Sequence, residues 1–216
     1  VKLLIRKGRV KVNDVTAKKP EMKIDTETDR VALDGKVLSW QQYEYYMLNK
    51  PAGVLSAARD KKQPTVLDLI ETNRKDLFPV GRLDKDTVGL LLICNDGQLA
   101  HRLLSPAHHV DKTYEVWLDG TLTPENIQQL ETGVDIGDDT LTLPAKIKAE
   151  YEDLSHVNIT IQEGRFHQVK RMFLACGRTV VRLKRLSLGS LVLDGQLKEG
   201  QARALTPEEI ESLHTV

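Results

Sequence analysis

The stretch GRLDKDTVGLLLICNDG, residues 81–97, constrains the fold more than any other part of the chain. A glycine lets the backbone turn, the trio Arg-Leu-Asp follows on a loop, and a second glycine leads into an apolar strand. The sequence therefore predicts that Asp84 displays its carboxylate at a turn. An isolated aspartate in such a loop is usually a turn residue that accepts backbone hydrogen bonds, so a chemical role needs support from elsewhere in the sequence.

Strand and helix patterns alternate after residue 44, which predicts a mixed α+β domain with a mainly antiparallel sheet. YYMLNKP indicates a strand ended by Pro51, while KTYEVWLDG and VNITIQEG alternate as strands. PTVLDLI and GQLAHRLLS are short helical patterns, and FHQVKRMFLACG predicts a helix that Gly177 ends. Its apolar stripe holds Val169, Met172 and Phe173.

Two further helices are marked by capping residues. TPENIQQLETG has Thr123 as a cap, Pro124 at the first helical position and Gly133 beyond the end. TPEEIESL has Thr206 and Glu209 at capping-box spacing. Both patterns predict helices with defined first residues.

The first forty residues form a separate predicted module. VKLLIRKGRVKVND indicates the end of a basic helix, a turn at Gly8 and a short strand, and DRVALDGKVL indicates another strand with an Asp34-Gly35 turn. The chain opens without methionine and inside a helical pattern, so we expect part of this module to be missing. The polar segment SWQQYE, from Ser39 to Glu44, is the predicted linker.

Composition limits the class of protein. A chain of 216 residues with 40% hydrophobic and 29% charged residues is typical of a folded protein with one sizeable core and a small second module. No apolar run approaches a membrane span, and Cys94 and Cys176 lie in apolar surroundings that indicate buried thiols. We expect a cytoplasmic, monomeric protein with no membrane partner.

Positive charge is concentrated although basic and acidic residues balance at 31 each. Between Glu163 and Arg185, the basic residues face a single acid; they are Arg165, Lys170, Arg171, Arg178, Arg182, Lys184 and Arg185. Lys and Arg also outnumber Asp and Glu in residues 1–40. Such clusters are typical of phosphate-binding surfaces, although a charge run is more often a solvated face.

Four motifs occur in an order and at spacings that resemble the RsuA-type branch of the pseudouridine synthases: KPAG, GRLDKDTVGLLLICNDG, KTYEV and EGRFHQVKRMF. The resemblance runs from about Tyr45 to the C-terminus. The pattern LIRKGRVKVN resembles the second half of an S4 RNA-binding module, a small α/β fold. The resemblance implies a partial S4-like domain at residues 1–40 and a catalytic domain at residues 45–216.

The resemblance implies a role for individual residues. Asp84 matches the carboxylate that these synthases use to attack or deprotonate the nucleoside, and Lys170 matches a basic residue that pairs with it. Tyr114 matches a tyrosine whose ring packs against the target uracil, although a core position is the alternative. Arg82 matches an arginine that fills the space left by the flipped base.

The remaining candidates are RNA contacts. Arg165, Lys112 and Arg171 are interpreted as phosphate-contacting or structural, and not as catalytic, since three cations cannot all pair with one carboxylate. His108 and His109 are interpreted as RNA contacts or as ordinary loop residues, because a metal site needs three or four convergent ligands. His167 is interpreted as structural. In the S4-like module, the expected contacts are Arg6, Lys7 and Arg9.

The expected reaction isomerises a uridine of structured ribosomal RNA and needs no cofactor and no metal. Within this branch, SPAHHVDKTYEV is most similar to the enzymes that modify RNA of the small ribosomal subunit. Small-subunit RNA or an assembly intermediate is therefore the expected partner. Large-subunit RNA and a non-catalytic ribosome-assembly factor are alternatives. A phosphoesterase or glycosidase would use Asp86 or Asp96 as a second carboxylate, but both residues also fit turns.

Overall fold

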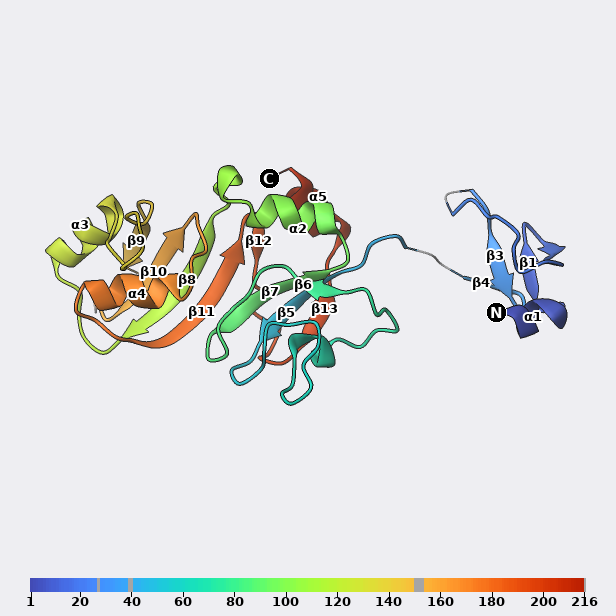
Figure 1. Ribbon diagram of the computed structural model, residues 1–216, viewed down its shortest axis with the longest axis horizontal. Coiled ribbons are helices and arrows are strands. Elements are labelled where there is room, and N and C mark those ends of the chain that lie inside the picture. The colour runs from blue at the N-terminus through green and yellow to red at the C-terminus, as the bar shows by residue number, and fades with distance from the viewer. Residues whose placement is uncertain (27, 39–40, 150–153, 216) are drawn as a thin grey trace. The chain divides into compact units, whose positions relative to one another are not determined.

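The computed structural model describes residues 1–26, 28–38, 41–149 and 154–215. The chain divides into two compact units, residues 1–42 and 43–216 (Figure 1). Ser39 and Trp40, the first residues of the predicted linker, lie outside the described residues. No helix among the described residues is long and apolar enough to cross a membrane.

The N-terminal unit holds one short helix and a small antiparallel sheet in the order β2-β1-β3-β4. Its elements are α1 (Lys2–Arg6), β1 (Val10–Val12), β2 (Val15–Thr16), β3 (Val31–Leu33) and β4 (Lys36–Val37). Ile5, Val12 and Ala17 form its core. The predicted turn at Asp34 and Gly35 joins β3 to β4, and both residues have the positive φ that a two-residue hairpin turn requires.

The C-terminal unit is built on one large sheet whose order is β13-β5-β7-β11-β8-β10-β9, with β6 paired to β7 and β12 to β11. Its strands are β5 (Tyr45–Lys50), β6 (Phe78–Pro79), β7 (Val88–Cys94), β8 (Lys112–Leu118), β9 (Lys146–Ala149), β10 (His156–Ile161), β11 (Val180–Leu188), β12 (Leu191–Val192) and β13 (Ala202–Ala204). Among the described strands, β7 and β11 form a parallel pair and the other pairs are antiparallel. The mixed, mainly antiparallel α+β fold predicted from the sequence is confirmed.

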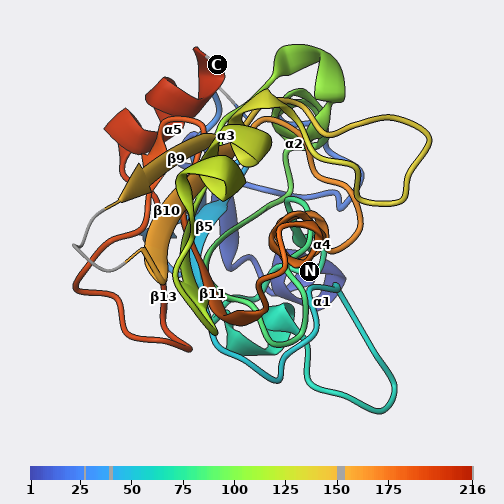
Figure 2. The same ribbon diagram turned by 90° about the vertical axis from the view of Figure 1, so that its left-hand side faces the viewer.

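Helices cover both faces of this sheet (Figures 1 and 2). The helical elements are η1 (Val66–Leu69), α2 (Gly97–Leu104), η2 (Pro106–His108), α3 (Pro124–Thr132), α4 (Gln168–Ala175) and α5 (Pro207–His214). One core cluster joins η1, α3 and α4 to the sheet, and the other joins α2 and α5. All residues of β7 are buried because its two faces contribute to different clusters.

Most predicted helix ends are confirmed. Thr123 caps α3 and Thr206 caps α5, each in a capping box with the residue three positions later. Both cysteines are buried and free. PTVLDLI differs from the prediction because it forms only the 3-10 turn η1, which Thr65 and Asp68 close through a capping box. A segment this short cannot support the successive bonds that an α-helix needs.

Gly89 marks a close approach between β7 and β11. Its φ is 98°, and a Cβ at this position would lie 2.3 Å from the carbonyl oxygen and 2.8 Å from the amide nitrogen of Arg185. Arg185 is the residue paired with Gly89 in the parallel ladder. The junction of β7 and β11 therefore requires glycine.

We expect Gly89→Ala to lower the free energy of unfolding by about 3 kcal/mol or more, since backbone strain and a backbone clash add. Gly177→Ala is the matched control because Gly177 also has positive φ, at 70°, but open space around its Cβ position. The control should lose about 1 to 2 kcal/mol from strain alone. Urea denaturation measures both values, and equal losses would contradict the close approach.

Candidate active site

The loop between β6 and β7 carries Asp84. The Thr87 amide donates to the Asp84 carbonyl at 3.1 Å, which closes a tight turn. Ser56 fixes the preceding residue, since its hydroxyl donates to the Leu83 carbonyl at 2.8 Å and accepts from the Leu83 amide at 3.1 Å. With Leu83 buried, the side chain of Asp84 stays 25% exposed at the tip of the loop.

Lys50, at the end of β5, supports this loop from within the protein. Its side chain is fully buried, and its ammonium donates to the carbonyls of Pro51 at 3.0 Å, Lys85 at 3.3 Å and Thr87 at 2.9 Å. Burial lowers the pKa of Lys50 to about 8, with the charges of Asp86 and Asp84 opposing the shift. The motif KPAG contains this lysine, but no local pattern in the sequence indicates that its charge is buried.

Lys170, in the first turn of α4, reaches the loop from the other side. Its ammonium lies 3.0 Å from Oδ2 of Asp84 and 2.6 Å from Oδ1 of Asp86. Burial acts to lower the pKa of Lys170, but hydrogen bonds to Asp86 and Asp84 outweigh it and raise the pKa. The bond from Lys170 lowers the pKa of Asp86. Lys170 therefore bridges two carboxylates. The sequence had indicated one of them, Asp86, as a turn residue or as the second carboxylate of a hydrolase, and not as a partner of Lys170.

His167 also contacts Asp84. Its Nε2 lies 3.4 Å from Oδ1 of Asp84, and its backbone is left-handed with φ of 48°. The helical pattern FHQVK predicted that the helix includes this residue, but α4 begins at Gln168. The side chain of Gln168 accepts from the Arg165 amide at 2.9 Å, which turns the chain just before the helix. The interpretation of His167 as purely structural does not account for its contact with Asp84.

Tyr114 lies on β8, where it pairs with Ile159 of β10 and Arg185 of β11. Its ring is buried in the main core cluster and also lines the pocket that holds Asp84. The pocket is lined by residues that include Arg82, Asp84, Tyr114, Arg165, His167 and Lys170. Five residues predicted from three separate motifs are thus brought together, namely Arg82, Asp84, Tyr114, Arg165 and Lys170.

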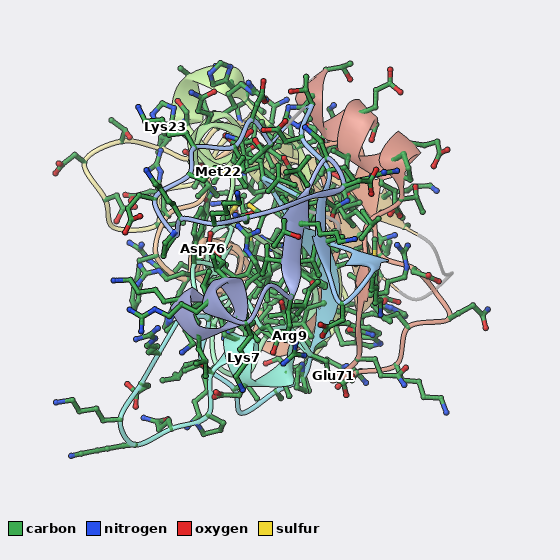
Figure 3. All side chains as sticks on the ribbon, turned by 90° about the vertical axis from the view of Figure 1, so that its right-hand side faces the viewer. Lys7, Arg9, Met22, Lys23, Glu71 and Asp76 are labelled. Carbon is green, nitrogen blue, oxygen red and sulfur yellow. The ribbon has the colours of Figure 1, made fainter. Side chains whose placement is uncertain are left out.

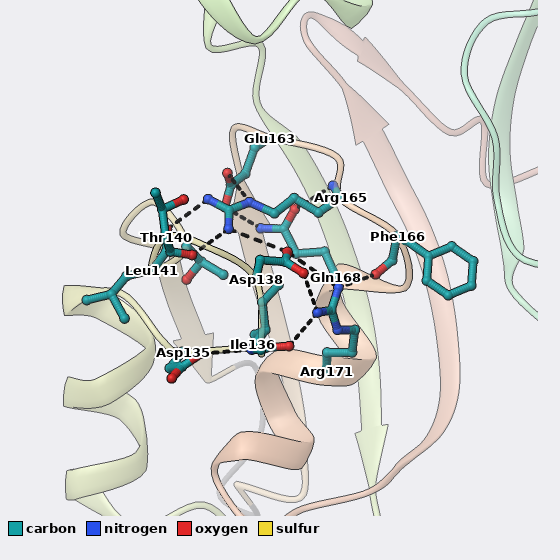
Figure 4. A network of polar contacts seen from close by, with 12 residues as sticks. Asp135, Ile136, Asp138, Thr140, Leu141, Glu163, Arg165, Phe166, Gln168 and Arg171 are labelled. Carbon is teal, nitrogen blue, oxygen red and sulfur yellow. Dashed lines mark hydrogen bonds and ion pairs between the residues drawn. The ribbon is translucent and has the colours of Figure 1, made fainter.

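A polar network fixes the turn that precedes α4 (Figure 4). The guanidinium of Arg165 donates to the carbonyls of Thr140 at 2.7 Å and Leu141 at 2.8 Å, and to Glu163 at 3.0 Å. Arg171 donates to the carbonyls of Ile136 and Phe166 and pairs with Asp138, and so completes the network. Both arginines were predicted RNA contacts. Their donors are used within the protein, which favours the structural alternative.

The other predicted RNA contacts are not among the described residues that line this pocket. The ammonium of Lys112 is buried and donates to the Val110 carbonyl at 2.9 Å, whereas His108 and His109 are exposed on and after η2. In the N-terminal unit, Arg6 is exposed. Lys7 and Arg9, which follow α1 and are labelled in Figure 3, are exposed as well. Arg9 pairs with Asp34. RNA contact by these residues stays a prediction.

The hydrogen bonds of Asp96 give this residue a structural role directly after β7. It is buried, it caps α2 by accepting from the amides of Gln98 and Leu99 at 3.0 Å, and it accepts from the Tyr45 hydroxyl at 2.9 Å. It is not among the described residues that line the Asp84 pocket. This placement removes Asp96 as the second carboxylate of a hydrolase.

Comparisons with known proteins agree on one family. Residues 44–175 match the family described as RNA pseudouridylate synthase. The chain is 47% identical to an uncharacterized RNA pseudouridine synthase, YtzG, of Bacillus subtilis, over 99% of this chain and 91% of the relative. It is 42% identical to ribosomal small subunit pseudouridine synthase A of Escherichia coli, over 97% and 90%. A crystal structure of a pseudouridylate synthase superposes with a TM-score of 0.75 at 39% identity, over 98% and 91%.

We expect Lys50→Met to lower the free energy of unfolding by about 2 to 3 kcal/mol, because the carbonyls of Pro51, Lys85 and Thr87 lose a charged donor. The matched control is Lys85→Met in the Asp84 loop, because the exposed ammonium of Lys85 donates to the Gln63 side chain. The control should change stability by less than about 0.5 kcal/mol. Urea denaturation distinguishes the two, and equal effects would mean that the Lys50 contacts contribute little.

The stability difference between the native chain and Lys50→Met should depend on pH. Because burial lowers the pKa of Lys50 from 10.5 to about 8, the unfolded chain holds a proton between these values that the folded protein has lost. The folded native chain therefore gains stability from this group as pH rises through that range. We expect the loss in Lys50→Met to grow above pH 8 by at most about 1.4 kcal/mol per pH unit. A loss that stays constant from neutral to alkaline pH would contradict the lowered pKa.

Proposed function

The chain belongs to the RNA pseudouridylate synthase family, and we propose that it converts a uridine of small-subunit ribosomal RNA to pseudouridine, with Asp84 starting the reaction. Membership makes the protein an isomerase that acts on RNA. The observation that carries the finer proposal is the convergence of Asp84, Lys170 and Tyr114 on one pocket.

The reaction exchanges one bond of the nucleoside for another. The bond between C1′ of the ribose and N1 of the uracil breaks, the base turns within the pocket, and C1′ bonds to C5. The proton of C5 is lost and N1 gains one, so no atoms are gained overall. Asp84 attacks the nucleoside or removes a proton from it to begin this sequence. The contact at 3.0 Å with the Lys170 ammonium fixes the carboxylate for that step.

Tyr114 and Arg82 have supporting roles in this proposal. The Tyr114 ring is held by the sheet and lines the pocket, so it offers a fixed flat surface for the uracil. A base must leave its stack before a protein can act on its glycosidic bond. Arg82 is exposed two residues before Asp84, where its planar guanidinium can stack in the space that the base vacates.

Small-subunit RNA is the proposed substrate because of the relatives. Several proteins named ribosomal small subunit pseudouridine synthase A are 40 to 42% identical to this chain over 97% of its length. The uncharacterized relative YtzG is more similar still, and its name gives no target. Large-subunit RNA is the alternative, and mapping distinguishes the two.

Incubation of the native chain with unmodified small-subunit and large-subunit RNA, followed by carbodiimide-dependent primer extension, tests the proposal. We expect a new stop in the small-subunit RNA and none with Asp84→Asn, which keeps the side-chain size but removes the nucleophilic charge. A stop only in large-subunit RNA would change the substrate. No stop in either RNA or in partly assembled subunits, or equal stops with Asp84→Asn, would contradict the proposed reaction.

Lys170→Met tests the ion pair separately. We expect kcat to fall by about 10- to 100-fold, because the variant removes a hydrogen bond to a charged group worth about 1.5 to 3 kcal/mol. Lys170→Arg should restore part of the rate because it keeps the positive charge. The matched control is Lys85→Met, which removes an exposed lysine of the neighbouring loop. Unchanged kcat in Lys170→Met would contradict the role of the ion pair.

A further inference from the structure

An exposed aromatic ring stands beside the pocket that holds Asp84. Phe166 is 72% exposed, although apolar residues of this size usually lie in cores. Figure 4 shows its ring pointing away from the polar network that fixes its backbone. Within the protein, the ring stacks on His167, with 3.8 Å between centroids and 19° between planes. Phe166 therefore exposes an apolar ring to solvent and contributes little to the hydrophobic core.

The stacked rings are continuous with the pocket wall. His167 lines the pocket, and its Nε2 is 3.4 Å from the carboxylate of Asp84. Phe166 is not among the described residues that line the pocket, but its ring stacks on His167, which is. The Phe166 ring is therefore placed to contact a nucleotide adjacent to a uridine held against Asp84.

The turn that carries the two rings is held before any ligand binds. The Phe166 carbonyl accepts from Nη1 of Arg171 at 3.1 Å, and His167 has the left-handed φ of 48°. Gln168, directly after the turn, is buried and donates to Glu163 at 2.6 Å. A rigid aromatic surface binds a ligand with a smaller loss of conformational entropy than a mobile one. The network of Figure 4 therefore acts as a support for the exposed ring.

We propose that Phe166 is a stacking platform for an unpaired base that neighbours the target uridine in the RNA. The inference rests on the proposed function. Arg82 is proposed to fill the space that the flipped uridine leaves in the stack. A neighbouring base that is itself unpaired still has a free face, and an aromatic ring can stack on it. The ring of Phe166 has no hydrogen-bonding group, so the platform accepts any base. Arg82, an exposed cation that lines the same pocket as His167, suits a phosphate that flanks such a base.

RNA binding by an inactive variant tests the stacking platform independently of the isomerisation reaction. The Asp84→Asn protein, alone and combined with Phe166→Ala, Phe166→Trp or Leu174→Ala, is titrated with labelled small-subunit RNA by fluorescence anisotropy. Leu174 is the matched control because it is an apolar residue of α4 that is 65% exposed. We expect Phe166→Ala to raise Kd by about 5- to 100-fold, the factor that corresponds to one lost base stack. Phe166→Trp and Leu174→Ala should stay within about twofold of the parent.

A second readout separates stacking from a structural effect. The RNA carries an abasic nucleotide on the 5′ side or the 3′ side of the mapped uridine. If Phe166 stacks on one of these bases, the difference in Kd between Phe166→Ala and its parent disappears for one abasic RNA and persists for the other. A difference that persists for both would overturn the proposal, as would a Kd for Phe166→Ala within about twofold of the parent.

The two proposals fail in different ways. If the native chain forms no pseudouridine, the proposed function fails, while the binding comparison still decides whether Phe166 contacts RNA; the abasic positions are then scanned along the RNA segment that the protein protects from nuclease. If the native chain is active and Phe166→Ala has unchanged Kd and KM, the platform alone fails.

Discussion

The site depends most on the buried ammonium of Lys50, which donates hydrogen bonds to three backbone carbonyls. These carbonyls belong to Pro51, Lys85 and Thr87, so a single side chain joins the end of β5 to the loop that carries Asp84. Burying a charge is costly unless hydrogen bonds compensate it, and here the lowered pKa reflects that cost. The benefit is a loop of fixed shape whose tip stays accessible. Asp84 can be exposed and still be held in place.

Sheet topology explains why distant segments meet at Asp84. β7 and β11 are paired in parallel, so the segments that precede them reach the same end of the sheet. The segment before β7 is the Asp84 loop, and the segment before β11 is α4, which carries Lys170. Gly89 permits the close approach of the two strands. One parallel pair within a mainly antiparallel sheet therefore brings the carboxylate and the ammonium together.

The sequence predicted the helix ends correctly where interactions between nearby residues determine them. The caps at Thr123 and Thr206 depend on residues three positions away, and the structure has both. The left-handed turn at His167 was missed because its support is only partly local. Gln168 accepts from the Arg165 amide within the same turn, but Arg171 donates to the Ile136 carbonyl of a distant loop. The burial of Lys50 depends on pairing between strands that are far apart in sequence. For the site, ordered motifs indicated Asp84, Lys170 and Tyr114, whereas Asp86, His167 and Lys50 became neighbours only through the tertiary fold.

The central claim is that Asp84 acts on a uridine held in the pocket beside Tyr114 and Lys170. A crystal structure of the Asp84→Asn protein with an RNA fragment that contains the mapped uridine tests this claim most directly. The account predicts an unstacked uracil against the Tyr114 ring, with C1′ of its ribose next to the side chain of residue 84. A uridine that remains stacked in the RNA while the RNA occupies another surface of residues 43–216 would contradict it.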